Sequence, residues 1–259
     1  IDPLLPQIAA TLAAEGRLVL QAPPGAGKTT RVPPALLASV PGRILLLEPR
    51  RLAARAAAER MAEALGEVPG QTVGWRIRGE SRIGPRTRIE VVTEGILTRM
   101  LQSDPDLPGV RAILFDEFHE RSLHADLGLA LALESRAALR PDLGIVVMSA
   151  TLDAAPVAAL LDDAPILTAE GRAFPVETRW LDRPLPAGPR LPQAMADLIL
   201  TALAGTEGGL LAFLPGEGEI RRTAAALDGR LPPGARLQPL YGALPAEAQR
   251  AALVPLAEG

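Results

Sequence analysis

Cysteine is absent from the 259-residue sequence, and histidine occurs only twice, at His119 and His124. The absence of cysteine excludes disulfides and cysteine-bound zinc. Two histidines are too few for a histidine-rich metal site. Any metal ion that the protein binds must therefore be held by oxygen ligands.

Long apolar runs are also missing. No run approaches the roughly 20 residues that a membrane-spanning helix needs, so we expect no membrane partner. With 48% hydrophobic and 22% charged residues, the composition is typical of a soluble globular protein, and the length favours two domains. The start, Ile1-Asp2-Pro3, lacks an initiator methionine and the pattern of a signal peptide. Targeting therefore stays undetermined, with a cytoplasmic location as the default expectation.

An excess of positive charge is lacking too, since the formal net charge is -3 and the pI is near 5.6. This balance argues against a protein that binds nucleic acid through a global basic field. Arginine is nevertheless clustered locally, and such clusters either bind phosphates or form solvated faces. One cluster comprises Arg50, Arg51, Arg55 and Arg60, and the other comprises Arg76, Arg78, Arg82, Arg86 and Arg88.

Lysine is almost absent, because arginine fills nearly every basic position and Lys28 is the only lysine. An ammonium group is a compact point charge, whereas guanidinium is a broad planar fork, so the two do not substitute in a tight phosphate cradle. The retention of lysine at this one position indicates that the site needs it.

Short apolar runs alternate with alanine-rich helical sequence through the first two thirds of the chain. Runs that are apolar on both faces are typical of buried parallel strands joined by right-handed βαβ crossovers. The predicted strands span residues 18–20, 44–47, 91–92, 112–115 and 145–148. The pattern predicts an α/β, doubly wound first domain.

A change in composition predicts a domain boundary near Gly171. Residues 168–192 are rich in proline, glycine and arginine, with one strand candidate at 176–181. A second α/β pattern follows, with predicted helices at 191–203 and 217–227 and predicted strands at 210–214 and 237–240. We therefore predict one domain over 1–171 and part of a second over 172–259, with too few strands to be complete.

A glycine-rich segment follows the first predicted strand and precedes apolar helical sequence, which is the context of a P-loop. Its glycines let backbone N–H groups converge on phosphates, Lys28 reaches the β and γ phosphates of ATP, and the Thr29 hydroxyl binds Mg²⁺. Ala22 stands where the general pattern has its first glycine, and a plain Gly/Pro turn is the alternative. The candidate nucleotide-binding residues are Pro24, Gly25, Ala26, Gly27, Lys28, Thr29 and Thr30.

Two adjacent carboxylates, Asp116 and Glu117, follow the predicted strand at 112–115. The carboxyl ends of parallel strands face one crevice, so these residues should face the P-loop. We expect Asp116 to hold Mg²⁺ and Glu117 to orient or deprotonate the attacking water, with Thr29, Asp116 and Glu117 forming the metal group. A helix N-cap is the alternative for this pair.

The segment 116–122 (DEFHERS) resembles the DExH signature of superfamily two helicases, specifically the DEAH-box branch. Further segments agree in order, and residues 73–80 (VGWRIRGE) are most similar to the bacterial HrpB subgroup. The other matching segments are 48–54 (EPRRLAA), 93–97 (TEGIL), 149–151 (SAT), 211–216 (LAFLPG) and 240–245 (LYGALP).

The resemblance implies two RecA-like P-loop domains with parallel sheets, the second incomplete. It also implies an ATP-dependent helicase core that uses Mg²⁺ and acts on single-stranded RNA, with DNA as an alternative partner. Lys28, Asp116, Glu117 and His119 would form the catalytic group. The implied nucleic-acid contacts are Arg50, Arg51, Thr93, Glu94, Gly95, Arg99 and Gly242.

Three further assignments rest on the same resemblance. Ser149 and Thr151 would couple the γ-phosphate site to domain movement, although a turn at the end of a strand is the alternative. Arg60 would stack on adenine, or would be a solvated residue on a helix face. Leu253 replaces its expected aromatic partner, which puts base stacking in doubt.

Two other functions compete with a helicase motor. A P-loop kinase would need a phosphate-acceptor site and lid arginines, and neither is recognisable. A module that binds ATP without hydrolysing it is disfavoured by Glu117. It is favoured by the absence of the family's Q-x-x-G-R-x-G-R run, whose arginines stabilise the transition state. We therefore expect the 259 residues alone to be nearly inactive.

Overall fold

The computed structural model describes residues 1–150, 154–170, 175–186, 188–206 and 208–253. Contacts divide the chain into two units, Ile1–Phe174 and Pro175–Gly259. In the described parts of the chain, no helix has the length and hydropathy to cross a membrane.

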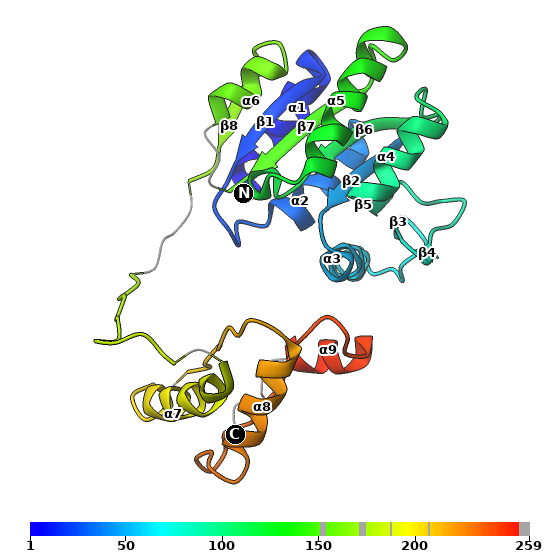
Figure 1. Cartoon of the computed structure of the whole chain (residues 1–259). Coiled ribbons are helices and arrows are strands. Elements are labelled where there is room, and N and C mark those ends of the chain that lie inside the picture. The colour runs from blue at the N-terminus through cyan, green and yellow to red at the C-terminus, as the bar shows by residue number, and fades with distance from the viewer. Residues whose placement is uncertain (151–153, 171–174, 187, 207, 254–259) are drawn as a thin grey trace. The chain divides into compact units, whose positions relative to one another are not determined.

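The first unit is built on one eight-stranded sheet, mostly parallel, with strand order β4-β3-β5-β2-β6-β7-β1-β8 (Figure 1). Only β3 and β4 pair in the antiparallel direction. The five strands expected from apolar runs are present, and three others join them. The strands are β1 (Arg17–Gln21), β2 (Arg43–Glu48), β3 (Val73–Ile77), β4 (Glu80–Arg82), β5 (Ile89–Thr93), β6 (Val110–Phe115), β7 (Gly144–Ser149) and β8 (Ile166–Thr168).

Helices cover both faces of this sheet, as a doubly wound α/β fold requires. One face packs against α1, α2 and α3, and the opposite face packs against α4, α5 and α6. The helices are α1 (Leu5–Glu15), α2 (Lys28–Ala35), α3 (Arg51–Ala64), α4 (Glu94–Ser103), α5 (Leu123–Ala138) and α6 (Ala154–Leu160). Short 3-10 turns are η1 (Asp2–Leu4), η2 (Leu36–Ala38) and η3 (Phe118–Glu120).

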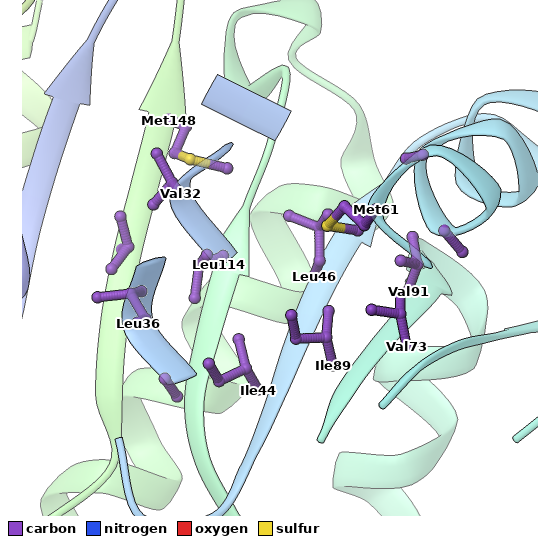
Figure 2. Packing of buried hydrophobic residues seen from close by; sticks show 14 of the residues in the cluster. Val32, Leu36, Ile44, Leu46, Met61, Val73, Ile89, Val91, Leu114 and Met148 are labelled. Atoms are coloured by element: carbon purple, nitrogen blue, oxygen red, sulfur yellow. The ribbon is translucent and has the colours of Figure 1, made fainter. Parts of the chain in front are cut away.

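Alternate residues of each central strand enter opposite cores, because successive side chains of a strand point to opposite faces. In β2, Ile44 and Leu46 join the core beneath α2 and α3 (Figure 2), whereas Leu45 and Leu47 join the core beneath α4 and α5. All four are at most 1% exposed. The sheet is therefore buried on both faces, and its carboxyl edge is left to carry polar side chains.

The second unit contains the two helices predicted from its sequence, α7 (Leu191–Leu203) and α8 (Glu217–Leu227). A turn, η4 (Gly188–Arg190), precedes α7, and α9 (Ala246–Leu253) follows α8. Ala196, Ile199 and Leu227 form a small core between α7 and α8.

The strands predicted at 176–181, 210–214 and 237–240 are wrong as strands of this structure, because none of these segments pairs with another described segment. An extended segment without a paired neighbour leaves its backbone groups to water and is marginal as a strand. Apolar side chains on them stay open to solvent, with Trp180 88% and Phe213 81% exposed.

Candidate active site

The glycine-rich segment connects the end of β1 to the start of α2. Gly25 and Gly27 have φ angles of 76° and 87°, a region that side-chain-bearing residues rarely adopt. A Cβ atom on Gly27 would also lie 3.0 Å from Arg31 Cγ. Lys28 and Thr29 open α2, where the first N–H groups have no partner within the helix. The loop thus presents backbone donors and the positive end of a helix dipole at the carboxyl edge of the sheet.

Lys28 is held by the acidic segment that follows β6. Its Nζ lies 3.2 Å from Glu117 Oε1, although the Lys28 side chain is only 4% exposed. Strand order explains this proximity, since β6 and β1 both flank β7 and end at the same edge. The structure therefore brings together the lysine and the acidic pair predicted from separate motifs.

Asp116 is buried and only half satisfied. Its Oδ1 accepts a hydrogen bond from the Glu117 N–H at 2.8 Å, whereas its buried Oδ2 has no partner among the described residues. Burial raises the pKa of the Asp116 carboxyl to about 6, an effect that the Thr29 hydroxyl and the Glu117 N–H partly offset. A buried acceptor without a partner is costly unless a donor or cation completes it.

These residues fit a magnesium ion that takes few ligands from protein. Mg²⁺ takes one or two carboxylates and fills its other positions with water and phosphate oxygens. Asp116 Oδ2 and the Thr29 hydroxyl supply oxygen ligands of that kind. No group of three or more potential His, Asp or Glu ligands occurs within the described ranges, so an all-protein metal cage is not formed there.

His119 connects the acidic segment to β7. Its Nε2 lies 3.4 Å from Glu117 Oε2, and its Nδ1 accepts a hydrogen bond from the Ala150 N–H at 3.3 Å. Ser149 ends β7, and its carbonyl accepts the N–H of Ala22 at 2.9 Å. The end of β7 therefore touches both the phosphate loop and the acidic segment. Thr151, the other predicted coupling residue, lies outside the described residues.

Glu48 is a site residue to which sequence reasoning gave no role. It ends β2, beside Thr93 of β5 in the strand register, and the Asp116 N–H donates to the carbonyl of the preceding Leu47. Burial, and then the negative charges of Asp116, Glu117 and Glu120, raise the pKa of the Glu48 carboxyl to about 8. Its position at the end of a buried strand, like that of Asp116, is the sequence signal that could have found it.

The predicted nucleic-acid residues of the first unit gather at the same edge. Arg50 and Arg51 begin α3 directly after β2, and Thr93, Glu94 and Gly95 begin α4 directly after β5. Because β2 and β5 are parallel neighbours, both helices begin at the same edge of the sheet, on its opposite faces, and both can bind phosphate through backbone N–H groups. Arg99 is exposed one turn further along α4.

Arg60 and Gly242 are the remaining predicted site residues. Arg60 lies on the exposed side of α3, about 14 Å along the helix axis from Arg51. Gly242 belongs to the second unit, where its carbonyl accepts a hydrogen bond from Gln249 Nε2 at 3.2 Å. The roles of both residues stay predictions.

Residues 6–160 match the family described as DEAD/DEAH box helicase. They span most of the first unit, including the phosphate loop and the acidic segment. The chain belongs to the DEAD/DEAH box helicase family.

Curated relatives and solved structures agree with this assignment. The chain is 50% identical over 258 residues to the ATP-dependent RNA helicase HrpB of Escherichia coli strain K12. The aligned region covers 99% of this chain and 32% of HrpB. It is 36% identical to the ATP-dependent RNA helicase HrpA of the same organism, over 85% of the chain and 17% of that protein.

The fold is shared as well. The crystal structure of Escherichia coli DEAH/RHA helicase HrpB superposes with a TM-score of 0.92, over 99% of this chain and 33% of that one. A second crystal structure, of the E. coli DExH-box NTPase HrpB, superposes with a TM-score of 0.82, over 100% of this chain and 32% of that one. This DEAD/DEAH box helicase chain therefore has the RecA-like α/β fold and spans about a third of HrpB.

Proposed function

We propose that this chain is the ATP-binding core of a motor that couples Mg²⁺-dependent ATP hydrolysis to single-stranded RNA. The observation that carries the proposal is the convergence of Lys28, Glu117 and the unpartnered Asp116 Oδ2 at one buried edge. The only lysine of the chain thus meets the two carboxylates that follow β6. ATP is the substrate that this arrangement of one cation, two acids and a glycine-rich loop fits.

Each residue has a distinct role in the proposed reaction. The loop N–H groups and Lys28 bind the β and γ phosphates, while Asp116 and Thr29 hold Mg²⁺. When bound, Mg²⁺ neutralises charge on the phosphate oxygens. Glu117 orients the attacking water and accepts its proton, and it must leave Lys28 to do so. His119 keeps Glu117 in position through the 3.4 Å contact and relays its state to Ala150.

Unpaired arginines of the first unit support the nucleic-acid part of the proposal. The side chains of several arginines there have neither a hydrogen-bond nor an ion-pair partner among the residues that the structure describes. All lie on the β3–β4 hairpin, on the loop after it, or on α3 and α4, the helices that follow β2 and β5, and so adjoin the β4-β3-β5-β2 half of the sheet. They are Arg51, Arg60, Arg78, Arg82, Arg86 and Arg99. Phosphates would supply the missing partners despite the net charge of -3.

RNA is proposed ahead of DNA because HrpB and HrpA are both named ATP-dependent RNA helicases. Residues 172–259 are proposed to begin a second RecA-like domain, since α7 and α8 match its predicted helices. ATP would then close the two domains on a strand, and hydrolysis would reopen them.

Steady-state ATP turnover by the full-length protein tests the proposal. It is measured with Mg²⁺ alone, with single-stranded RNA and with single-stranded DNA of the same sequence. We expect stimulation by RNA that exceeds stimulation by DNA. Turnover that neither nucleic acid changes would contradict the coupling, and Mg²⁺-independent turnover would contradict the metal assignment.

An arginine pair tests the proposed nucleic-acid edge. Arg51→Ala should weaken RNA binding at every sequence and reduce the salt dependence by about one phosphate contact. Arg111→Ala is the matched control, because Arg111 lies near the start of β6, at the opposite edge of the sheet, and pairs with Asp142. Equal losses in the two variants would contradict the assignment of Arg51.

A further inference from the structure

One five-residue segment, 117–121, contacts the phosphate loop, the residue after β7 and the N-cap of α3. Glu117 contacts Lys28 of the phosphate loop, and His119 accepts the N–H of Ala150 after β7. Glu120, which the proposed reaction does not use, forms an ion pair with Arg50 at 2.9 Å. A shift of this one segment would therefore change the contacts of Lys28 at the nucleotide site and of Arg50 at the predicted nucleic-acid site together.

The Arg50–Glu120 pair conflicts with the role proposed for Arg50. Arg50 is the N-cap residue of α3, and its side chain is 72% exposed, as expected for a group that meets a nucleic-acid phosphate. In the present structure its Nη2 is instead bound to the Glu120 carboxylate. A phosphate and Glu120 are both anions, so they compete for the same guanidinium donor.

We propose that the Arg50–Glu120 ion pair acts as a latch, and that Glu120 is a positioning residue that RNA displaces from Arg50. With the latch closed, the 117–121 segment keeps Glu117 on Lys28, so the phosphate-binding lysine is occupied. When an RNA phosphate takes Arg50, Glu120 is released and Glu117 leaves Lys28 more readily. RNA binding then favours ATP binding, and by reciprocity ATP favours RNA binding. This inference rests on the proposed function and names the contact that couples its two sites.

The backbone of the segment suits such a movement. Glu117 and Arg121, on either side of η3, both have positive φ angles, 50° and 51°. Residues with side chains hold this conformation only where surrounding contacts impose it. Arg121 pairs with Asp126 of α5 at 3.1 Å, which anchors the far end of the segment. Release of Glu120 therefore frees the end of η3 while its connection to α5 persists.

The latch must be weak in order to open. Arg50 is mostly exposed and Glu120 is 35% exposed, and an ion pair in such a setting shifts an equilibrium by about fivefold at most. RNA binding can overcome that cost with a few phosphate contacts. The latch consequently changes nucleotide affinity by a few-fold and does not act as an on-off switch.

Binding measurements on charge variants test the latch without requiring turnover. A fluorescein-labelled single-stranded RNA reports RNA affinity by anisotropy, and a non-hydrolysable ATP analogue with Mg²⁺ is titrated with and without saturating RNA. Wild type should bind the analogue more tightly when RNA is present. Glu120→Gln should bind RNA up to about fivefold more tightly, and its analogue affinity without RNA should rise toward the RNA-bound value.

Two further variants separate the latch from general damage. The charge swap Arg50→Glu with Glu120→Arg should return the RNA-free analogue affinity to the wild-type value while weakening RNA binding. Glu217→Gln removes the same charge from an exposed helical pair of the second unit and should leave every value unchanged.

The outcomes distinguish this inference from the function on which it rests. If wild type binds both ligands with coupling but Glu120→Gln behaves like Glu217→Gln, the latch is overturned and the proposed function stands. A charge swap that keeps the analogue affinity of Glu120→Gln also overturns the latch. If wild type binds neither the analogue nor RNA, the proposed function fails and the latch with it.

Discussion

Lys28 Nζ lies 3.2 Å from Glu117 Oε1, so the side chain proposed to bind phosphate is paired with the side chain proposed to activate water. Both groups sit at a mostly buried edge, where an unpaired charge would be costly. The pair therefore keeps both charges satisfied when no nucleotide is present. Nucleotide phosphates would take over Lys28 and leave Glu117 free to act as a base.

Glu117→Gln should separate binding from hydrolysis. An amide can orient water but cannot accept its proton, so we expect hydrolysis to slow by at least about a hundredfold. Mg²⁺-ATP affinity should be retained, because Lys28, Thr29 and Asp116 are intact and Lys28 loses its competing partner. The measurement is nucleotide affinity and turnover on the same full-length preparation.

Glu134→Gln is the control for that variant, because Glu134 is exposed on α5 in the same unit. It should change neither affinity nor turnover. A parallel fall in affinity and rate for Glu117→Gln would instead make Glu117 a structural or metal-supporting group.

Stability should fall as pH rises through the titration of Glu48. Its pKa is raised from 4.5 to about 8, so the folded state binds its proton more tightly than the unfolded state does. The contribution of Glu48 to the free energy of unfolding is complete below pH 4.5 and is lost as pH approaches 8. A shift of this size corresponds to about 5 kcal/mol at most, and charge coupling at the site will reduce it.

Glu48→Gln should remove the Glu48 part of this pH dependence, because the amide is neutral throughout, and leave the smaller part that comes from the raised pKa of Asp116. Urea unfolding without nucleotide at pH 5 and pH 8.5 should show similar stability of the two proteins at pH 5. At pH 8.5 the variant should be more stable, by roughly 1–3 kcal/mol. Identical pH slopes in wild type and Glu48→Gln would show that Glu48 is not the responsible group.

The 259-residue polypeptide should bind Mg²⁺-ATP yet hydrolyse it close to the background rate. It keeps Lys28, Thr29, Asp116 and Glu117, but it contains no Q-x-x-G-R-x-G-R run. An arginine finger contributes about a thousandfold or more to phosphoryl transfer. RNA should therefore stimulate this polypeptide little, and robust RNA-stimulated turnover would mean that another residue supplies the finger.

The central strands and the site could be predicted because their signals are local. Buried parallel strands such as β2 and β6 are continuous apolar runs. Asp116 and Glu117 directly follow β6, and Lys28 follows β1 after the glycine-rich loop. The strand β3 escaped prediction because it contains Gly74 and Arg76 and pairs with a short polar strand. A Cβ atom at position 74 would lie 2.2 Å from the Arg82 carbonyl oxygen, so Gly74 is needed for the close pairing of β3 with β4.

The raised pKa of Glu48 and the Arg50–Glu120 pair could not be predicted, because both depend on which strands become neighbours. Nothing local in the sequence places β2 between β5 and β6. The second unit shows the converse case. Residues 210–214 have the composition of a strand, but a strand forms only when another segment pairs with it.

Lys28, the only lysine of the chain, is the residue on which the proposed nucleotide site most directly depends. Mg²⁺-ATP binding to wild type and to Lys28→Ala is the decisive measurement, with circular dichroism to show that both are folded. We predict Mg²⁺-dependent binding by wild type and loss of binding or turnover in Lys28→Ala, because the phosphate charges lose their lysine counter-charge. Near-normal nucleotide binding and turnover by folded Lys28→Ala in the full-length protein would contradict the account.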